Sequence, residues 1–300
     1  MKRIPSISCR MPAIGWLVCI ALLLAGCSKQ NEFEYVDDII KDIDDNTPAI
    51  VVTDENGNES VLPGGTMIGI YVMDGNGNVS LQQAEVDENG KAVLPTSDQQ
   101  GGIIAYSPYQ ESWSKAAIDN PPVFTVASDQ RLEENYNASD LMIGSMGQVT
   151  RAAEGAMVLE HMLAKVAIHV IDETGTVNLG SISAELLNVK NNVLVDLPKK
   201  QVTTIPSSSA NIFMLSKMTT DWRISNYAIV APQQISEGMP FFAITLYGNR
   251  QSYPAPQAAE LESGKTYTIN LRLTEHGLIP NGWYITDWNE ENERIIDVRG

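Results

Sequence analysis

Histidine is the residue type that would most directly supply metal-binding or acid–base chemistry, and this chain has three: His161, His169 and His276. His161 and His169 are eight residues apart in one strand-like run, a spacing that predicts the same side of a strand. Neither has a cysteine or carboxylate at the spacing of a metal-binding motif, and His276 lies next to Gly277 in a turn. The pattern favours packed or surface histidines over metal ligands.

The segment Asp74-Gly75-Asn76-Gly77-Asn78 is the best metal candidate, because Glu85 stands at the twelfth position, as in a calcium-binding loop. However, Val79 replaces the glycine that such a loop needs at its sixth position, and no helical pattern flanks the segment. A hairpin turn explains these residues better.

Catalytic nucleophiles have no recognisable setting in the chain. Gly144-Ser145-Met146-Gly147 lacks the spacing of a nucleophile elbow, and the glycine patterns that bind phosphates or dinucleotides are missing. A catalytic pair among the 37 acidic residues would depend on separation in space, and nothing in the sequence favours one. We therefore predict a protein that is not an enzyme, without catalytic residues, cofactor-binding residues, metal ligands or cofactors.

Cys27 is the residue with the clearest chemical role. Three basic residues and an apolar run over residues 13–24 precede it, which is typical of a secretory signal and too short to span a bilayer. Leu24-Ala25-Gly26 before the cysteine matches the lipobox of bacterial lipoproteins, in which the thiol is acylated and the peptide is cut just before it. We predict a lipoprotein signal peptide over residues 1–26 and a palmitate-type lipid on Cys27. An ordinary signal with an incidental cysteine is the alternative.

The charge balance excludes one class of partner. Three of the 20 basic residues and none of the 37 acidic ones precede Cys27, so the chain after the signal has a net charge of −20. Such a chain repels nucleic acid, and we predict no nucleic-acid partner. The other two cysteines, Cys9 and Cys19, lie in the signal, which leaves no thiol for a disulfide or a zinc site. The fold must therefore depend on hydrophobic burial.

Residues 27–48 form a polar, acidic arm. Seven acidic residues stand against only Lys29 and Lys41, and a segment of this composition has little reason to fold. We predict a tether, with a short helix over residues 34–43 as the alternative.

From residue 49 onward the pattern changes to β. Runs rich in β-branched residues, such as 49–53 and 67–73, alternate with Asn-Gly and Asp-Gly turns. Strand patterns continue towards the C-terminus, including one long central strand expected over residues 157–171, and helix signals are scarce. We predict an all-β fold of two antiparallel β-sandwich domains, residues 49–150 and 151–300.

Several short stretches occur in an order that resembles the fimbrillin-like (type V pilin) lipoproteins of anaerobic Gram-negative bacteria. They are residues 104–109, 129–130, 139–142, 159–166, 230–233, 261–267 and 285–288. Each stretch is unspecific alone, but the ordered set spans nearly the whole chain after Cys27.

The resemblance implies two transthyretin-like β-sandwich domains and a subunit of surface fimbriae, with other fimbrial subunits as partners. It also implies that His161 is a structural residue at the start of a strand. Family members of the shaft type lose their N-terminal segment, lipid included, to an arginine-specific protease. The groove that this exposes accepts a strand from a neighbouring subunit, which is β-strand addition.

The chain departs from the shaft pattern because no arginine occurs between Cys27 and Arg131. Three outcomes stay open: the lipid is retained on an anchor, tip or accessory subunit; a lysine-accepting protease cuts after Lys41; or assembly needs no cut. At the other end, residues 294–298 are a strand candidate, either donated to a neighbour or completing their own sheet.

We predict a fimbrial subunit, or an accessory or anchor adhesin component, at the cell outer membrane. It would be surface-exposed, lipid-anchored or assembled in fimbriae, with a host or bacterial surface ligand as a further partner. The alternative is a stand-alone surface glycan-binding lipoprotein, in which Trp113, Trp222 or Trp283 would stack on sugars. Burial is the commoner fate of tryptophan.

Overall fold

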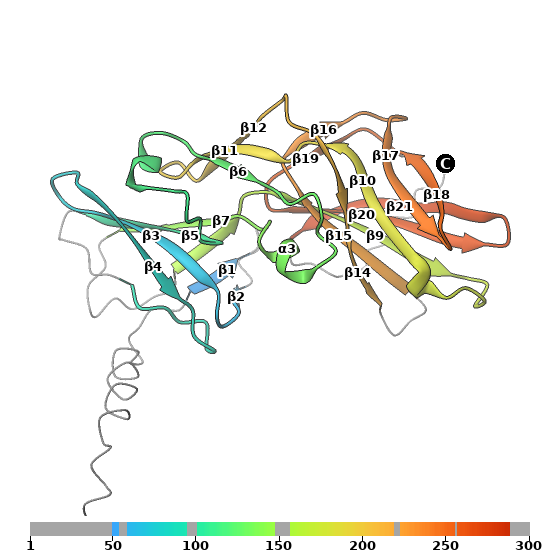
Figure 1. The fold of residues 1–300 in the computed structure, drawn as a ribbon, viewed down its shortest axis with the longest axis horizontal. Helices are drawn as coiled ribbons and strands as arrows, with labels where there is room; N and C mark the ends of the chain where they lie inside the picture. The colour runs from blue at the N-terminus through green and yellow to red at the C-terminus, as the bar shows by residue number, and fades with distance from the viewer. Residues whose placement is uncertain are drawn as a thin grey trace, which may run out of the picture. The chain divides into compact units, whose positions relative to one another are not determined.

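The computed structural model describes residues 50–53, 59–94, 101–147, 157–218, 223–255 and 257–288. Most of these residues lie in strands (Figure 1), so the predicted all-β class is confirmed. The helical elements among them are short: η1 (Lys115–Ile118), α3 (Glu133–Asn137) and η2 (Leu179–Ser181). None of the described helices is long and apolar enough to cross a membrane. Cys27, Lys41 and the strand candidate at 294–298 lie outside the described residues.

The first sheet has seven strands in the order β2-β1-β8-β7-β5-β3-β4. In chain order they are β1 (Ile50–Thr53), β2 (Glu59–Val61), β3 (Met67–Met73), β4 (Val79–Glu85), β5 (Gly102–Ser107), β7 (Met142–Met146) and β8 (Met157–His161). All neighbours are antiparallel except β1 and β8, which run parallel. Both faces of the sheet are covered: Ile68 and Ile70 belong to one buried cluster, and Tyr71 and Tyr106 to another.

A five-stranded and a four-stranded sheet pack against each other in the second half of the chain. The five-stranded sheet has the order β14 (Leu215–Met218), β15 (Arg223–Val230), β9 (Ala164–Asp172), β20 (Lys265–Thr274) and β21 (Gly277–Asp287). The four-stranded sheet has the order β13 (Ala210–Phe213), β10 (Ile182–Val189), β17 (Pro240–Leu246) and β18 (Asn249–Pro254). Ile168 and Ile269 from the first of these sheets share one buried core with Leu186 and Ile244 from the second.

Two small sheets complete the described fold. β16 (Gln233–Ile235) pairs with β19 (Ala259–Leu261), and β12 (Gln201–Thr204), β11 (Asn192–Asp196) and β6 (Val123–Thr125) form a three-stranded sheet. In the latter, Phe124 of the N-terminal half stands opposite Val193 of the C-terminal half. The described residues belong to one compact unit, and its larger core contains both of these side chains. The predicted division at residue 150 stays a prediction.

The long strand expected over residues 157–171 is wrong in one respect, because the run is divided into β8 and β9. Met162 and Leu163 separate the two strands. Met162 donates its backbone N–H to Leu141 O at 2.8 Å, and Leu163 O accepts from Gly264 N at 2.8 Å. These contacts with distant segments divert the chain from the first sheet into the five-stranded sheet.

Candidate functional site

A buried histidine links the first sheet to the last described strand. His161 is only 8% exposed and is the final residue of β8, not the first residue of a strand as the resemblance implied. Its Nδ1 lies 2.8 Å from Asp140 Oδ1, and because a carboxylate only accepts, Nδ1 carries the proton and donates it. The imidazole stacks on Trp288, with ring centroids 4.1 Å apart. We call Asp140, His161, Lys165 and Trp288 the His161 cluster.

Lys165, near the start of β9, holds Trp288 from a second direction. Its Nζ donates to the backbone O of Trp288 at 2.5 Å and lies 4.9 Å from the centroid of the indole. Trp288 N in turn donates to Gly264 O at 3.1 Å. Aromatic and cation–π contacts of this kind contribute roughly 0.5–2 kcal/mol each. The end of β21 is therefore fixed by β8, β9 and the turn before β20.

A histidine paired with an aspartate is also the arrangement of a general base. In the part of the chain that the structure describes, the only side-chain hydrogen bond of His161 is the one to Asp140, and Trp288 covers its ring. The described residues also contain no group of three or more metal-ligating side chains. The His161 cluster therefore has the contacts of a structural clamp, with no nucleophile to activate.

Gln130 hydrogen-bonds the N-terminal half of the chain to the C-terminal half. In the sequence it lies shortly before Asp140 of the His161 cluster. Its side chain is 0% exposed; Nε2 donates to Ile229 O at 2.8 Å, and Oε1 accepts from Ile229 N at 2.8 Å. Only an amide side chain offers a donor and an acceptor in this arrangement. Its own backbone N–H donates to Phe213 O at 2.9 Å. Gln130 thus bonds to the backbone of β15 through its side chain and to the backbone of β13 through its own N–H.

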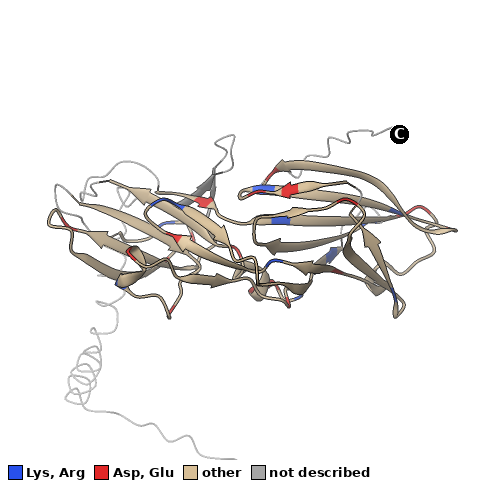
Figure 2. Ribbon diagram, turned by 90° about the horizontal axis from the view of Figure 1, so that it is seen from above, with Lys and Arg blue, Asp and Glu red and all other residues tan. Residues whose placement is uncertain are grey.

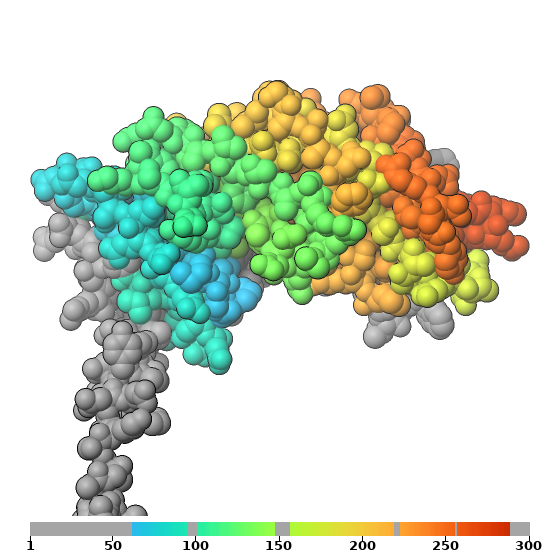
Figure 3. Space-filling view, in the orientation of Figure 1, coloured from blue at the N-terminus to red at the C-terminus, as the bar shows by residue number. Residues whose placement is uncertain are grey.

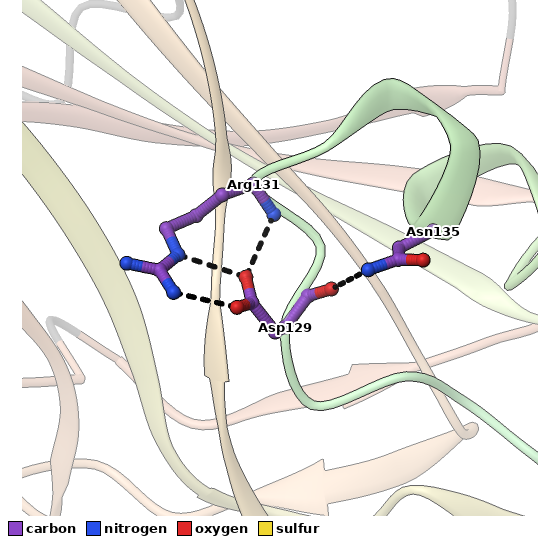
Figure 4. Close-up of polar contacts among 3 residues, drawn as sticks. All are labelled: Asp129, Arg131 and Asn135. Atoms are coloured by element: carbon purple, nitrogen blue, oxygen red, sulfur yellow. Dashed lines mark hydrogen bonds and ion pairs between the residues drawn. The ribbon is translucent and has the colours of Figure 1, made fainter.

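Arg131, the first arginine after Cys27, is held by the residue two positions before it (Figure 4). Its Nε and Nη2 donate to the two carboxylate oxygens of Asp129 at 2.8 and 2.5 Å, and Asn135 Nδ2 donates to Asp129 O at 2.9 Å. The bonds from Arg131 lower the pKa of Asp129 to about 2. The guanidinium also lies 5.0 Å from the centre of the Phe213 ring. Arg131 is thus held against the folded chain by Asp129 and Phe213.

The other two histidines have separate partners. His169 Nδ1 lies 2.7 Å from Ser225 Oγ, between β9 and β15, and His276 lies in the β20–β21 turn, where its backbone N donates to Thr274 Oγ1. The structure therefore does not bring the three histidines to one site.

The calcium-loop candidate forms the turn between β3 and β4. The Asp74 carboxylate accepts from the backbone N of Asn78 at 2.8 Å, from its Nδ2 at 2.7 Å and from Asn76 N at 2.9 Å. These bonds, chiefly those from Asn78, hold the pKa of Asp74 below its usual value. The carboxylate is thus occupied by the turn itself, and Gly77 adopts the positive φ that such a turn requires.

Two of the three tryptophans considered for sugar stacking are buried. Trp113 and Trp283 are buried, with exposed fractions of 5% and 7%, and Trp222 lies outside the described residues. Trp113 packs against Tyr106 with ring centroids 4.7 Å apart. Neither Trp113 nor Trp283 presents a face to a surface glycan.

The partners of His161 were missed by reasoning from residue chemistry, yet the sequence contained a signal for them. Asp140, Lys165 and Trp288 each belong to one of the short stretches that carry the family resemblance. The structure brings these stretches together, and the 261–267 stretch joins them through Ser263 Oγ, which donates to Met162 O at 2.6 Å. The ordered motifs mark the junction between the sheets.

The fold and this junction can be compared with known proteins. The family model of fimbrillin-like proteins matches residues 51–288, so the chain belongs to the fimbrillin-like family. This is a family of structural and adhesin proteins, which confirms the prediction that the chain is not an enzyme. Among proteins of curated function, none matches the sequence.

Two crystal structures show the same fold. One is a candidate cell adhesion protein from Bacteroides uniformis, 18% identical, with a TM-score of 0.57 over 82% of this chain and 99% of that one. The other is a candidate cell adhesion protein from Bacteroides ovatus, 14% identical, with a TM-score of 0.59 over 82% of this chain and 99% of that one. At these identities the likeness shows a shared fold.

Proposed function

We propose that the chain is a subunit of a surface fimbria, or an anchor or accessory adhesin component of one. It would be exported as a lipoprotein through Cys27 and joined to neighbouring subunits by strand addition at the cell outer membrane. Membership of the fimbrillin-like family carries this proposal. The two proteins of the same fold are both described as candidate cell adhesion proteins, which supports it. Two transthyretin-like sandwiches, residues 49–150 and 151–300, are the domain organisation that we propose.

The surface charge of the described part agrees with a protein partner. The lysines and arginines are scattered along the ribbon among acidic residues (Figure 2). Several are already paired with carboxylates, for example Lys217 with Glu133 at 2.9 Å and Arg272 with Glu173 at 3.2 Å. Binding to a phosphate backbone requires a continuous basic surface, so we propose no nucleic-acid partner.

β1 is the strand that we assign to exchange during assembly. It pairs with β8 over three residues only, with Val51 opposite Val158. Met157 and Leu159 of β8 are both 0% exposed and belong to a buried cluster. If β1 leaves with the residues before it, β8 has unpaired backbone groups beside an apolar surface. A strand from a neighbouring subunit satisfies both needs through main-chain hydrogen bonds and alternate apolar side chains.

A disulfide between β1 and β8 tests this assignment. The variant Val51→Cys/Val158→Cys joins two opposed positions of the parallel pair, at a Cα separation that a disulfide tolerates. The oxidised protein is expected to stay monomeric and the reduced protein to polymerise, measured by sedimentation and by electron microscopy of cells. Gln234→Cys/Glu260→Cys, across β16 and β19, is the matched control and should polymerise in both states. Fibres from the oxidised β1–β8 variant would refute strand addition at β8.

The mature N-terminus separates the routes of processing. Mass spectrometry of protein from purified outer membranes should show an acylated Cys27 if the lipid is retained, which we expect because no arginine precedes Arg131 in the exported chain. A chain that begins at Asp42 would instead mean a cut after Lys41. Failure to incorporate labelled palmitate, with the product in the cytosol, would overturn export as a lipoprotein altogether.

A further inference from the structure

A cavity of about 590 Å³ lies where the connection after β9 meets the β20–β21 hairpin. Both segments lie at the end of the molecule that carries the red hairpin (Figure 3). Glu173 N donates to Leu273 O at 3.2 Å and so fixes the two segments to each other. The lining residues are Glu173, Thr174, Thr176, Val177, Leu273, Thr274 and Glu275. The volume is within the range of small-ligand sites, roughly 300–1,000 Å³.

The hydrogen bonds around the cavity fix the direction of its threonine hydroxyls. The buried carboxylate of Asp172 accepts from Thr174 Oγ1 at 2.6 Å, so that hydroxyl has used its only proton. Thr176 Oγ1 lies 2.7 Å from Thr174 Oγ1 and must therefore be the donor of that pair. Thr176 is left with acceptor lone pairs only. Each step follows from the one proton that a hydroxyl carries.

The remaining polar side chains of the lining are acceptors as well. Thr274 Oγ1 donates to Gly277 O at 3.0 Å, which uses its proton. Glu173 is held by Arg272 at 3.2 Å through one oxygen, and Glu275 is exposed. A carboxylate accepts and never donates when ionised. The cavity therefore suits a ligand rich in hydrogen-bond donors and repels one that carries negative charge.

An exposed tyrosine is hydrogen-bonded to the loop that supplies part of this acceptor-lined cavity. Tyr247, in the β17–β18 turn, is 59% exposed, and its Oη accepts from Asn178 N at 3.0 Å. Asn178 directly follows Val177 of the lining, so the hydroxyl is tied down while the ring stays open to solvent. Val177 and Leu273 add apolar surface inside. Hydroxyl donors combined with apolar C–H faces are the chemistry of a neutral sugar.

We propose that this cavity, together with the nearby Tyr247, binds a neutral carbohydrate. Sugar hydroxyls donate to Thr176 and Glu275, and a C–H face of the sugar packs on the tyrosine ring. The site would give the subunit a surface ligand, which goes beyond assembly and does not depend on it, because none of its residues belongs to β1 or β8. A basic peptide would donate to the same acceptors through ionic contacts, so the salt dependence of capture and the oligolysine peptides in the test distinguish it from a neutral sugar.

The test uses the complete mature chain on an array of neutral and sialylated oligosaccharides and of oligolysine peptides. We expect capture of neutral oligosaccharides, with affinity nearly constant between ~50 and ~500 mM NaCl because no ion pair is formed. Thr176→Val/Glu275→Gln should weaken the best neutral hit about tenfold, since valine offers no acceptor and a neutral amide accepts less strongly than a carboxylate. Tyr247→Ala should also weaken it, while Tyr247→Phe keeps the ring and should bind.

Glu111→Gln, an exposed glutamate of the first half of the chain, is the matched control and should bind like the wild type. Four results would overturn the proposal: no captured oligosaccharide, equal capture by the double variant, a preference for sialylated glycans, or salt-sensitive capture of oligolysine alone. Polymerisation of the double variant is measured in parallel. Lost sugar binding in the double variant with normal fibres leaves the assembly function intact, whereas a wild-type chain that captures the sugar but forms no fibres contradicts assembly alone.

Discussion

The two parallel strand pairs among the described residues differ sharply in extent. β1 lies against β8 over three opposed residues, from Ile50 opposite Met157 to Val52 opposite Leu159. β20 lies against β9 over eight, from Thr266 opposite Lys165 to Leu273 opposite Asp172. Parallel ladders are slightly weaker per residue than antiparallel ones, so length and burial decide how firmly each pair is held.

Their surroundings increase the difference. β9 is paired along nearly its whole length on the other side too, with eight residues of β15 opposite it. β8 has a different partner at each end: residues 157–159 pair with β1, whereas Glu160 and His161 pair with β7. The β9–β20 pair is thus the permanent centre of its sheet, and the β1–β8 pair has the features of a removable one. Where strands must be exchanged, a short parallel pair costs less to open than a long one.

The largest expected effect comes from the centre of the β9–β20 pair. Ile269 is 1% exposed, and Ile269→Ala should lower the free energy of unfolding by about 2–5 kcal/mol, because the lost methyl groups leave a cavity. Ile279→Ala, the same change on β21 at a side chain that is 40% exposed, is the control and should cost far less. Urea unfolding followed by fluorescence measures both. Equal losses would remove the distinction between centre and edge.

Hydrogen exchange compares the two pairs directly in the unaltered protein. Amides of residues 157–159 should exchange at least about a hundredfold faster than those of residues 166–170, since local opening of a short pair requires less free energy than global unfolding. Residues 103–105 of β5 lie within the same sheet as β8 and serve as an internal reference for slow exchange. Protection of β8 equal to that of β9 would contradict the assignment of β1 as the strand exchanged from β8.

Local chemistry was sufficient to predict individual strands. The β-branched and aromatic run at 67–73, ended by Asp-Gly, corresponds to β3 residue for residue, because the turn and the pattern agree. The break at Met162 and Leu163 has no glycine or proline to announce it. It arises from hydrogen bonds to residues 141 and 264, which are distant in sequence. Pairings of this kind were beyond prediction from residue patterns.

The candidate sites show the same contrast between what local motifs predict and what only the folded chain reveals. Cys27 and Lys41 were found from local motifs and stay predictions, because they lie outside the described residues. The His161 cluster depends on residues from three separate stretches, and only the resemblance to a family had marked those stretches. The acceptor-lined cavity depends on which hydroxyl donates to which oxygen. No sequence pattern carries that information, since it follows from the folded loop.

The smallest effect that we argue concerns the far end of the β9–β20 pair. Asp172 is the last residue of β9, 5% exposed, and its carboxylate accepts from Thr174 N at 2.8 Å and Val177 N at 2.9 Å. Burial alone would raise the pKa of Asp172, but the bonds from Thr174 and Val177 outweigh burial and hold it below the usual 3.8. Asp172→Asn replaces one acceptor with a donor and should cost about 1–2 kcal/mol at pH 7.

The sign of the pH dependence follows from the lowered pKa. A carboxyl group that is more acidic in the folded state stabilises the fold above its unfolded pKa, and this contribution is lost as the pH falls through the folded value. The difference in stability between wild type and Asp172→Asn should therefore be constant above about pH 5 and shrink below pH 3.8, where the wild type loses its charged acceptor. Urea unfolding across this range measures it, with the exposed Asp119→Asn as the control for the change of charge. A difference that persists at pH 2 would mean that packing of the loop, and not the charged acceptor, secures the end of the long pair.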